Sequence, residues 1–177
     1  MRHDQRYTAT ARWLHWLMVL LIAAAVPVGL WMVYFEPRDE TFKLQLYDLH
    51  EGLGFTLVLL LLLRVAVRLS RPAPPMPGDT PALVRLLARL NHFGLYVVLL
   101  AQPVLGFLAT NAWGFPFHWW GVLPIPSPIG RDEALAPILS ALHWYGAMLL
   151  VTMVAAHLLG VAYHAYVRRD GLLRRML

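Results

Sequence analysis

The chain has no cysteine and little charge: 14% of its 177 residues are charged, whereas 59% are hydrophobic. The absence of cysteine excludes disulfides, iron–sulfur ligation, thiolate ligation of haem and the thioether attachment of a c-type haem. Any metal or haem must therefore be held by other side chains. The scarcity of charge, together with a mean hydropathy of +0.55, excludes an ordinary water-soluble domain of this length.

Four long apolar runs divide the chain. A hydrocarbon core of about 30 Å is crossed by roughly 20 helical residues, and each run is long enough to do so. The pattern predicts an all-α fold, an integral membrane four-helix bundle that forms a single domain over residues 1–177. The expected spans are about 12–35, 47–69, 92–111 and 137–167.

The connectors carry their own signals. Residues 70–81 include five prolines, a composition that breaks helices. At the end of this stretch, Thr80 followed by Pro81 is typical of an N-cap and the first position of a new helix. The connector over residues 111–136 places tryptophans among prolines, which suits a membrane–water interface. These tryptophans are Trp113, Trp119 and Trp120.

The basic residues are distributed unequally between the two sides of the predicted bundle. Twelve lie on the side of the termini, and only Arg38, Lys43 and Arg131 lie on the other. The positive-inside rule therefore predicts that both termini lie in the cytoplasm. It also explains the basic residues without nucleic-acid binding. The twelve are Arg2, Arg6, Arg12, Arg64, Arg68, Arg71, Arg85, Arg89, Arg168, Arg169, Arg174 and Arg175.

Four histidines fall within or near the start of these spans. His143 and His157 are fourteen residues apart, a spacing that returns to within ~40° of the same helix face and rises about 21 Å. With the predicted orientation, His50 shares the outer level with His143, and His15 shares the inner level with His157. Neutral imidazole is an axial ligand of haem iron, so four such residues could hold two haems. A single buried histidine is about as often structural.

Glycines accompany the outer histidines: Gly52 and Gly54 follow His50, and Gly146 follows His143. They would let the helix backbones approach a flat macrocycle closely, although helix–helix packing explains them as well.

Residues 11–16 (ARWLHW), 49–52 (LHEG) and 64–68 (RVAVR), with the His143/His157 pair, resemble the bacterial di-haem cytochrome b561 family over nearly the whole chain. The resemblance implies two b-type haems with bis-histidine ligation by His15, His50, His143 and His157. It also implies electron transport in the bacterial inner membrane by a multi-pass protein. One activity in this family is a superoxide oxidase that oxidises superoxide at the periplasmic side and reduces ubiquinone. Related cytochrome b subunits instead receive electrons from a partner dehydrogenase.

Four other polar residues of the spans are candidates for contacts with a haem or a quinone. His92 is expected to contact a haem propionate or a quinone, although its depth also allows iron ligation. His164 suits a donor to a quinone carbonyl or a plain interfacial histidine. Arg64 and Arg68 suit propionate neutralisation or quinone orientation, or serve only as topological anchors. No role is assigned to the two remaining histidines, His3 and His118.

Three functions from different classes follow. The first is a superoxide oxidase that reduces ubiquinone, and the second is a haem-carrying subunit of a membrane dehydrogenase. The third is a haem-free transporter or structural membrane protein, which a colourless preparation would support.

Overall fold

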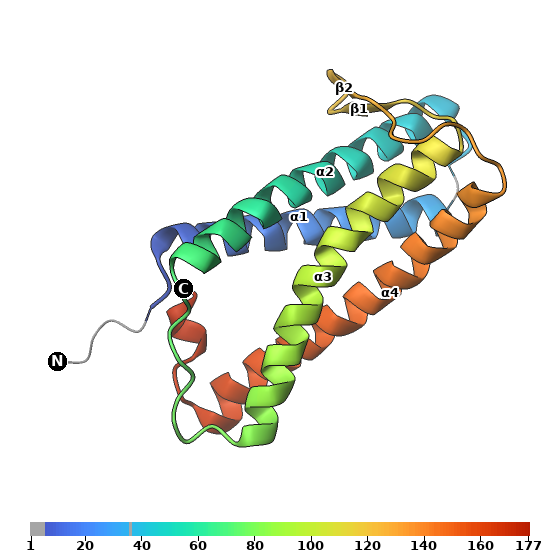
Figure 1. The fold of residues 1–177 in the computed structure, drawn as a ribbon. Coiled ribbons are helices and arrows are strands. Elements are labelled where there is room, and N and C mark those ends of the chain that lie inside the picture. Colours follow the sequence, from blue (N-terminus) through green and yellow to red (C-terminus); the bar gives the residue numbers. More distant parts are fainter. Residues whose placement is uncertain (1–5, 36) are drawn as a thin grey trace.

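Four long helices form the protein, described here by a computed structural model over residues 6–35 and 37–177 (Figure 1). Arg2, His3 and Glu36 lie outside the described residues. All four helices, the last taken together with the π-helical turn η1 that continues it, are long and apolar enough to cross a membrane. The elements are α1 (Ala9–Tyr34), α2 (Glu40–Ser70), α3 (Ala82–Ala112), α4 (Leu135–Ala162), η1 (Tyr163–Arg168) and the short 3-10 helix η2 (Leu173–Arg175).

Two helices are longer than their apolar runs predict. α2 begins at Glu40 because the Asp39 carboxylate accepts a hydrogen bond from the Phe42 N–H at 2.7 Å, which caps the helix. α3 begins at Ala82, well before residue 92. The expected N-cap at Thr80 is wrong: Pro81 is the cap residue, and the Thr80 hydroxyl is buried without a hydrogen-bond partner.

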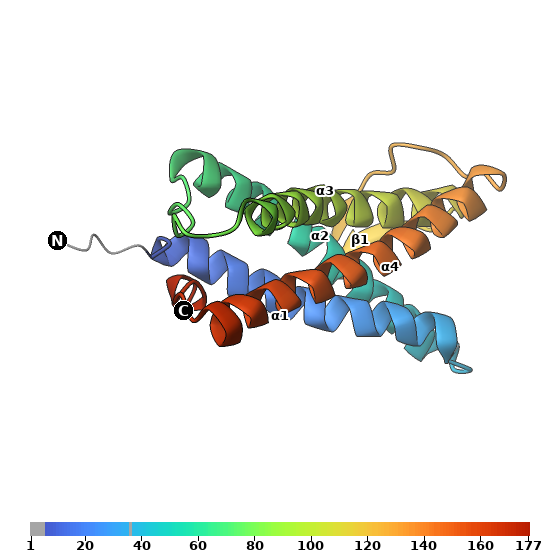
Figure 2. The ribbon, with the colours of Figure 1, turned by 90° about the horizontal axis from the view of Figure 1, so that it is seen from below.

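The helices pack as two pairs, α1 with α2 and α3 with α4, and α2 also contacts α3 (Figures 1 and 2). One buried cluster centres on Met18, Leu57 and Leu61 from α1 and α2, and another joins the facing ends of α3 and α4. Many leucines remain exposed on the outside of the bundle. Lipid tails are as apolar as leucine, so a membrane bundle gains little by burying them.

A small hairpin lies at one end of the bundle, which is called the hairpin end below. Strands β1 (Phe117–Trp119) and β2 (Leu123–Ile125) pair antiparallel within the connector from α3 to α4, and β1 contacts α2 and α3 (Figure 1). The indole N–H groups of Trp119 and Trp120 both donate to the Thr56 hydroxyl on α2, at 3.1 and 3.2 Å. The tryptophan-rich connector is therefore folded onto the bundle, with the Trp120 backbone in the left-handed region at a φ of 53°.

Both described ends of the chain lie at the opposite end, which is called the terminal end (Figure 1). The Trp16 indole N–H donates to the Met176 carbonyl at 2.8 Å, and the Tyr7 N–H donates to the Arg175 carbonyl at 3.1 Å. The segment after α4 thus packs against the start of α1.

Candidate functional site: two pairs of histidines

Four histidines from three helices meet as two pairs of rings. In the hairpin-side pair, the rings of His50 on α2 and His143 on α4 have centres 6.0 Å apart and planes at 86°. In the terminus-side pair, His15 on α1 and His157 on α4 have centres 6.3 Å apart and planes at 69°. These are the pairs that the depth analysis predicts.

One helix carries a member of each pair. His143 and His157 both belong to α4, which runs without interruption from Leu135 to Ala162. Fourteen residues of regular helix separate the two side chains by about 21 Å along the axis. The uninterrupted helix therefore sets the distance between the two sites.

Hydrogen bonds orient both rings of the hairpin-side pair. His50 Nδ1 donates to the Ala25 carbonyl and His143 Nδ1 donates to the Gln102 carbonyl, each at 3.0 Å. A carbonyl oxygen only accepts, so Nδ1 carries the proton in both rings and Nε2 keeps its lone pair. This is the arrangement that prepares a histidine to bind a metal through Nε2.

The ring spacing fits haem iron. An imidazole nitrogen lies about 2 Å from a bound first-row metal ion and about 1 Å from its own ring centre. Two rings on opposite sides of one iron therefore have centres roughly 6 Å apart. Within residues 6–35 and 37–177, no group of three or more His, Asp or Glu side chains is arranged to hold a metal ion. Isolated imidazole pairs match the axial needs of a haem better than those of a bare ion.

His92 lies beside the terminus-side pair. Its ring centre is 5.1 Å from that of His157, and its Nδ1 donates to the Ala88 carbonyl at 2.6 Å. This ring spacing is about 1 Å too short for an iron between the two rings. The geometry therefore favours His15 as the partner of His157, with His92 as a neighbour of the site.

The two arginines at the end of α2 have different surroundings. Arg64 donates to the Ala11 carbonyl at 2.9 Å and interacts electrostatically with His15 and His157. It therefore places a positive charge at the terminus-side pair. Arg68 lies over the Tyr7 ring, 5.9 Å from its centre, in a cation–π contact.

His164 belongs to a polar cluster at the terminal end. It is 5% exposed, and its Nδ1 donates to an Asp170 carboxylate oxygen at 2.6 Å. Arg168 donates to the same oxygen at 3.2 Å and to Asp79 at 2.8 Å. Burial alone would raise the pKa of Asp170, but hydrogen bonds from His164, a backbone N–H and Arg168 lower the pKa below its ordinary value.

Side chains cover the glycines that sequence reasoning singled out. The Trp120 ring lies over Gly52 and the Gln102 amide lies over Gly146. Gly54 faces Pro103 on α3, as helix packing predicts. Two other glycines face the histidine rings, and sequence reasoning missed them: Gly29 and Gly106.

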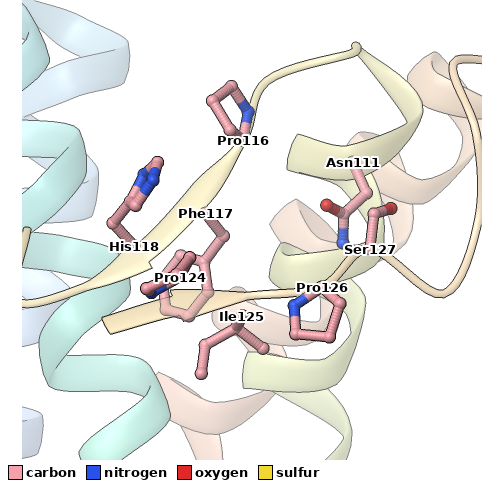
Figure 3. Close-up of a pocket in the computed structure, with 8 residues that line it drawn as sticks. All are labelled: Asn111, Pro116, Phe117, His118, Pro124, Ile125, Pro126 and Ser127. Carbon is pink, nitrogen blue, oxygen red and sulfur yellow. The ribbon is translucent and has the colours of Figure 1, made fainter. Parts of the chain in front are cut away.

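A separate pocket of about 380 Å³ opens at the hairpin end (Figure 3). It lies between Asn111 at the end of α3 and the hairpin, and it includes His118. None of the paired histidines lines it. The pocket therefore belongs to the hairpin rather than to the two candidate haem sites.

Known proteins are similar to this chain over nearly its whole length. The profile of a family described as "Prokaryotic cytochrome b561" matches residues 6–177. The chain belongs to this family. Membership confirms the resemblance seen in the sequence, and it makes the protein a multi-pass membrane cytochrome of electron transfer that uses b-type haem.

Three relatives in this family are similar over almost their full length. "Cytochrome b561 homolog 2" of Escherichia coli (strain K12) is 31% identical over 174 residues, which cover 98% of this chain and 92% of the relative. "Probable superoxide oxidase CybB" of Yersinia pestis is 26% identical, covering 98% and 96%. "Cytochrome b561 homolog 1" of Escherichia coli (strain K12) is 27% identical, covering 97% of each.

Proposed function

We propose that this cytochrome carries electrons between two b-type haems, one held by each histidine pair. The observation that carries the proposal is the occurrence of two imidazole pairs, 6.0 and 6.3 Å between ring centres, joined by one helix. His50 and His143 would hold the hairpin-side haem, and His15 and His157 the terminus-side haem. Arg64 would neutralise a propionate of the terminus-side haem.

The chemistry follows from the ligand type. Because each haem would be held by two histidines, it would supply one-electron transfer rather than oxygen binding. The protein side chains hold the rings, exclude water and set the distance between the two sites. No side chain is required as an acid or base where the electron enters.

We further propose that the hairpin end faces the periplasm and the terminal end faces the cytoplasm. The twelve basic residues of the terminal side support this orientation through the positive-inside rule. Electrons would then enter at the hairpin-side pair and leave near the terminus-side pair.

Superoxide and ubiquinone are the proposed substrates. One superoxide gives up one electron and becomes O₂, whereas ubiquinone takes two electrons and two protons to become ubiquinol. The name of the Yersinia pestis relative, "Probable superoxide oxidase CybB", supports the oxidation of superoxide. At the terminal end, His164, Arg68 and His92 are the proposed polar contacts of the quinone, and the Nε2 of His164 is not used by its bond to Asp170.

The purified protein should be reduced by superoxide and reoxidised by ubiquinone without any partner, and stopped-flow haem absorbance measures both steps. Because Lys43 and Arg131 pair with Glu40 (3.9 Å) and Glu133 (2.7 Å), no strong positive patch remains among the described outer residues to attract the anion. The superoxide rate should therefore rise or stay flat as ionic strength increases. A protein with both haems that superoxide does not reduce would be a dehydrogenase subunit instead, and a stable dehydrogenase partner would then co-purify.

A further inference from the structure

Two glycines touch the rings of the hairpin-side pair. A Cβ atom added to Gly29 on α1 would lie 2.8 Å from Cε1 of His50. A Cβ atom added to Gly106 on α3 would lie 3.0 Å from Cε1 of His143. The distance at Gly29 is shorter than real Cβ atoms show, so the His50 ring occupies space that exists only because Gly29 lacks a side chain. The distance at Gly106 is tighter than nine in ten real Cβ contacts, so the His143 ring would have to shift by a few tenths of an ångström to admit a Cβ there.

The same pattern appears twice in the fold. Gly29 follows Ala25 by four residues and Gly106 follows Gln102 by four, so each glycine lies on the same helix face as a carbonyl that accepts a histidine Nδ1 bond. His50 of α2 packs on α1 in this way, and His143 of α4 packs on α3. Each ring is therefore held between a carbonyl oxygen and a bare helix backbone.

The terminus-side pair has no such arrangement among the described residues. The ring nitrogens of His15 and His157 make no hydrogen bond there, and no glycine faces either ring. Gly160, one turn of α4 from His157, has nothing within 4 Å of an added Cβ. Gly94 faces the flexible end of Met153.

We propose that Gly29 and Gly106 are positioning residues of the hairpin-side haem site. They allow the His50 and His143 rings to approach α1 and α3 closely enough for both Nδ1 atoms to reach their carbonyls. These bonds fix each ring's rotation and leave Nε2 as the ligand atom. The inference rests on the proposed function, because it takes these two histidines as ligands of one haem.

An added methyl group would move the ring or the helix. Either movement would lengthen the hydrogen bond from the histidine Nδ1 to its carbonyl. It would also turn the Nε2 lone pair away from the facing histidine. The effect should be larger at Gly29 than at Gly106, because the contact at Gly29 is shorter and lies below 3.0 Å. Loss of a hydrogen bond to a metal-bound histidine lowers metal affinity by roughly 10- to 100-fold.

The experiment compares Gly29→Ala and Gly106→Ala with two controls, Gly160→Ala and Gly130→Ala. Gly160 on α4 and Gly130 in the connector before α4 both have nothing within 4 Å of an added Cβ. Each purified variant is measured for haem per chain, for the electron paramagnetic resonance signals of its ferric haems, and for both haem midpoint potentials. The terminus-side haem of the same molecule reports whether the bundle has folded.

We expect Gly29→Ala to shift the signal and potential of the hairpin-side haem, or to lose that haem, with the terminus-side haem unchanged. Gly106→Ala should do the same to a smaller degree, and both controls should match the parent protein. An unchanged hairpin-side haem in both test variants would overturn the inference. If the Gly29→Ala protein does not accumulate, an unchanged hairpin-side haem in Gly106→Ala alone would overturn the inference. The proposed function has its own test, because a His143→Ala protein that keeps the hairpin-side haem would contradict the ligand assignment whatever the glycine variants show.

Discussion

Replacing His143 with alanine should remove the hairpin-side haem and leave the terminus-side haem in place. His50 would keep its bond to the Ala25 carbonyl but would lose the facing imidazole 6.0 Å away, so the hairpin-side site would retain one of its two proposed ligands. His157 lies about 21 Å away along α4, and it and its partner His15 should be unaffected. A pyridine haemochrome assay on the purified variant should find one haem per chain in place of two.

The control for this change is His118→Ala. His118 is also a histidine at the hairpin end, but it lines the separate pocket and belongs to neither pair. It should keep both haems. Two haems in His143→Ala would show that the pairing of His50 with His143 is wrong.

Replacing His15 should have an equally large effect at the terminal end, whereas replacing His92 should not. His15 faces His157 at the spacing of roughly 6 Å that an intervening iron needs, and His92 lies about 1 Å too close. We therefore expect His15→Ala to lose the terminus-side haem. His92→Ala should keep both haems and change only the potential or the quinone reaction of that site.

The two variants should be measured side by side, by haem content and by reduced-minus-oxidised spectra. The reverse result, with loss in His92→Ala and retention in His15→Ala, would make His92 the partner of His157. Loss in both would mean that His92 supports the site as strongly as a ligand does.

The histidine pairs were predictable from the sequence because the direction of each helix and the position of each histidine along it determine depth in the membrane. The four apolar runs give four membrane crossings, and successive crossings run in opposite directions. A histidine's distance from the start of its run therefore gives its depth. His50 and His143 fall at one level by this rule, and His15 and His157 at the other. The structure brings the same residues together.

The helix ends and ring contacts were not predictable in this way. Apolar runs mark only the part of a helix inside the hydrocarbon, so the polar first turn of α2 at Glu40 was missed. The start of α3 at Ala82 lies one residue after the position that Thr80 and Pro81 predict, although the apolar run begins only near residue 92. The carbonyls of Ala25 and Gln102 accept histidine bonds through the backbone, which carries no sequence signal. Gly29 became distinctive only once the His50 ring was placed against it.

The haem-to-protein ratio of the purified protein tests the central claim most directly. A pyridine haemochrome assay, combined with amino-acid analysis for the protein concentration, counts b-type haems per chain without assuming any donor or acceptor. Two imidazole pairs with the ring spacing of a bis-histidine haem predict two haems per chain, both low-spin in the reduced-minus-oxidised spectrum. A ratio of one, or a colourless protein, would contradict the assignment of a haem to each pair.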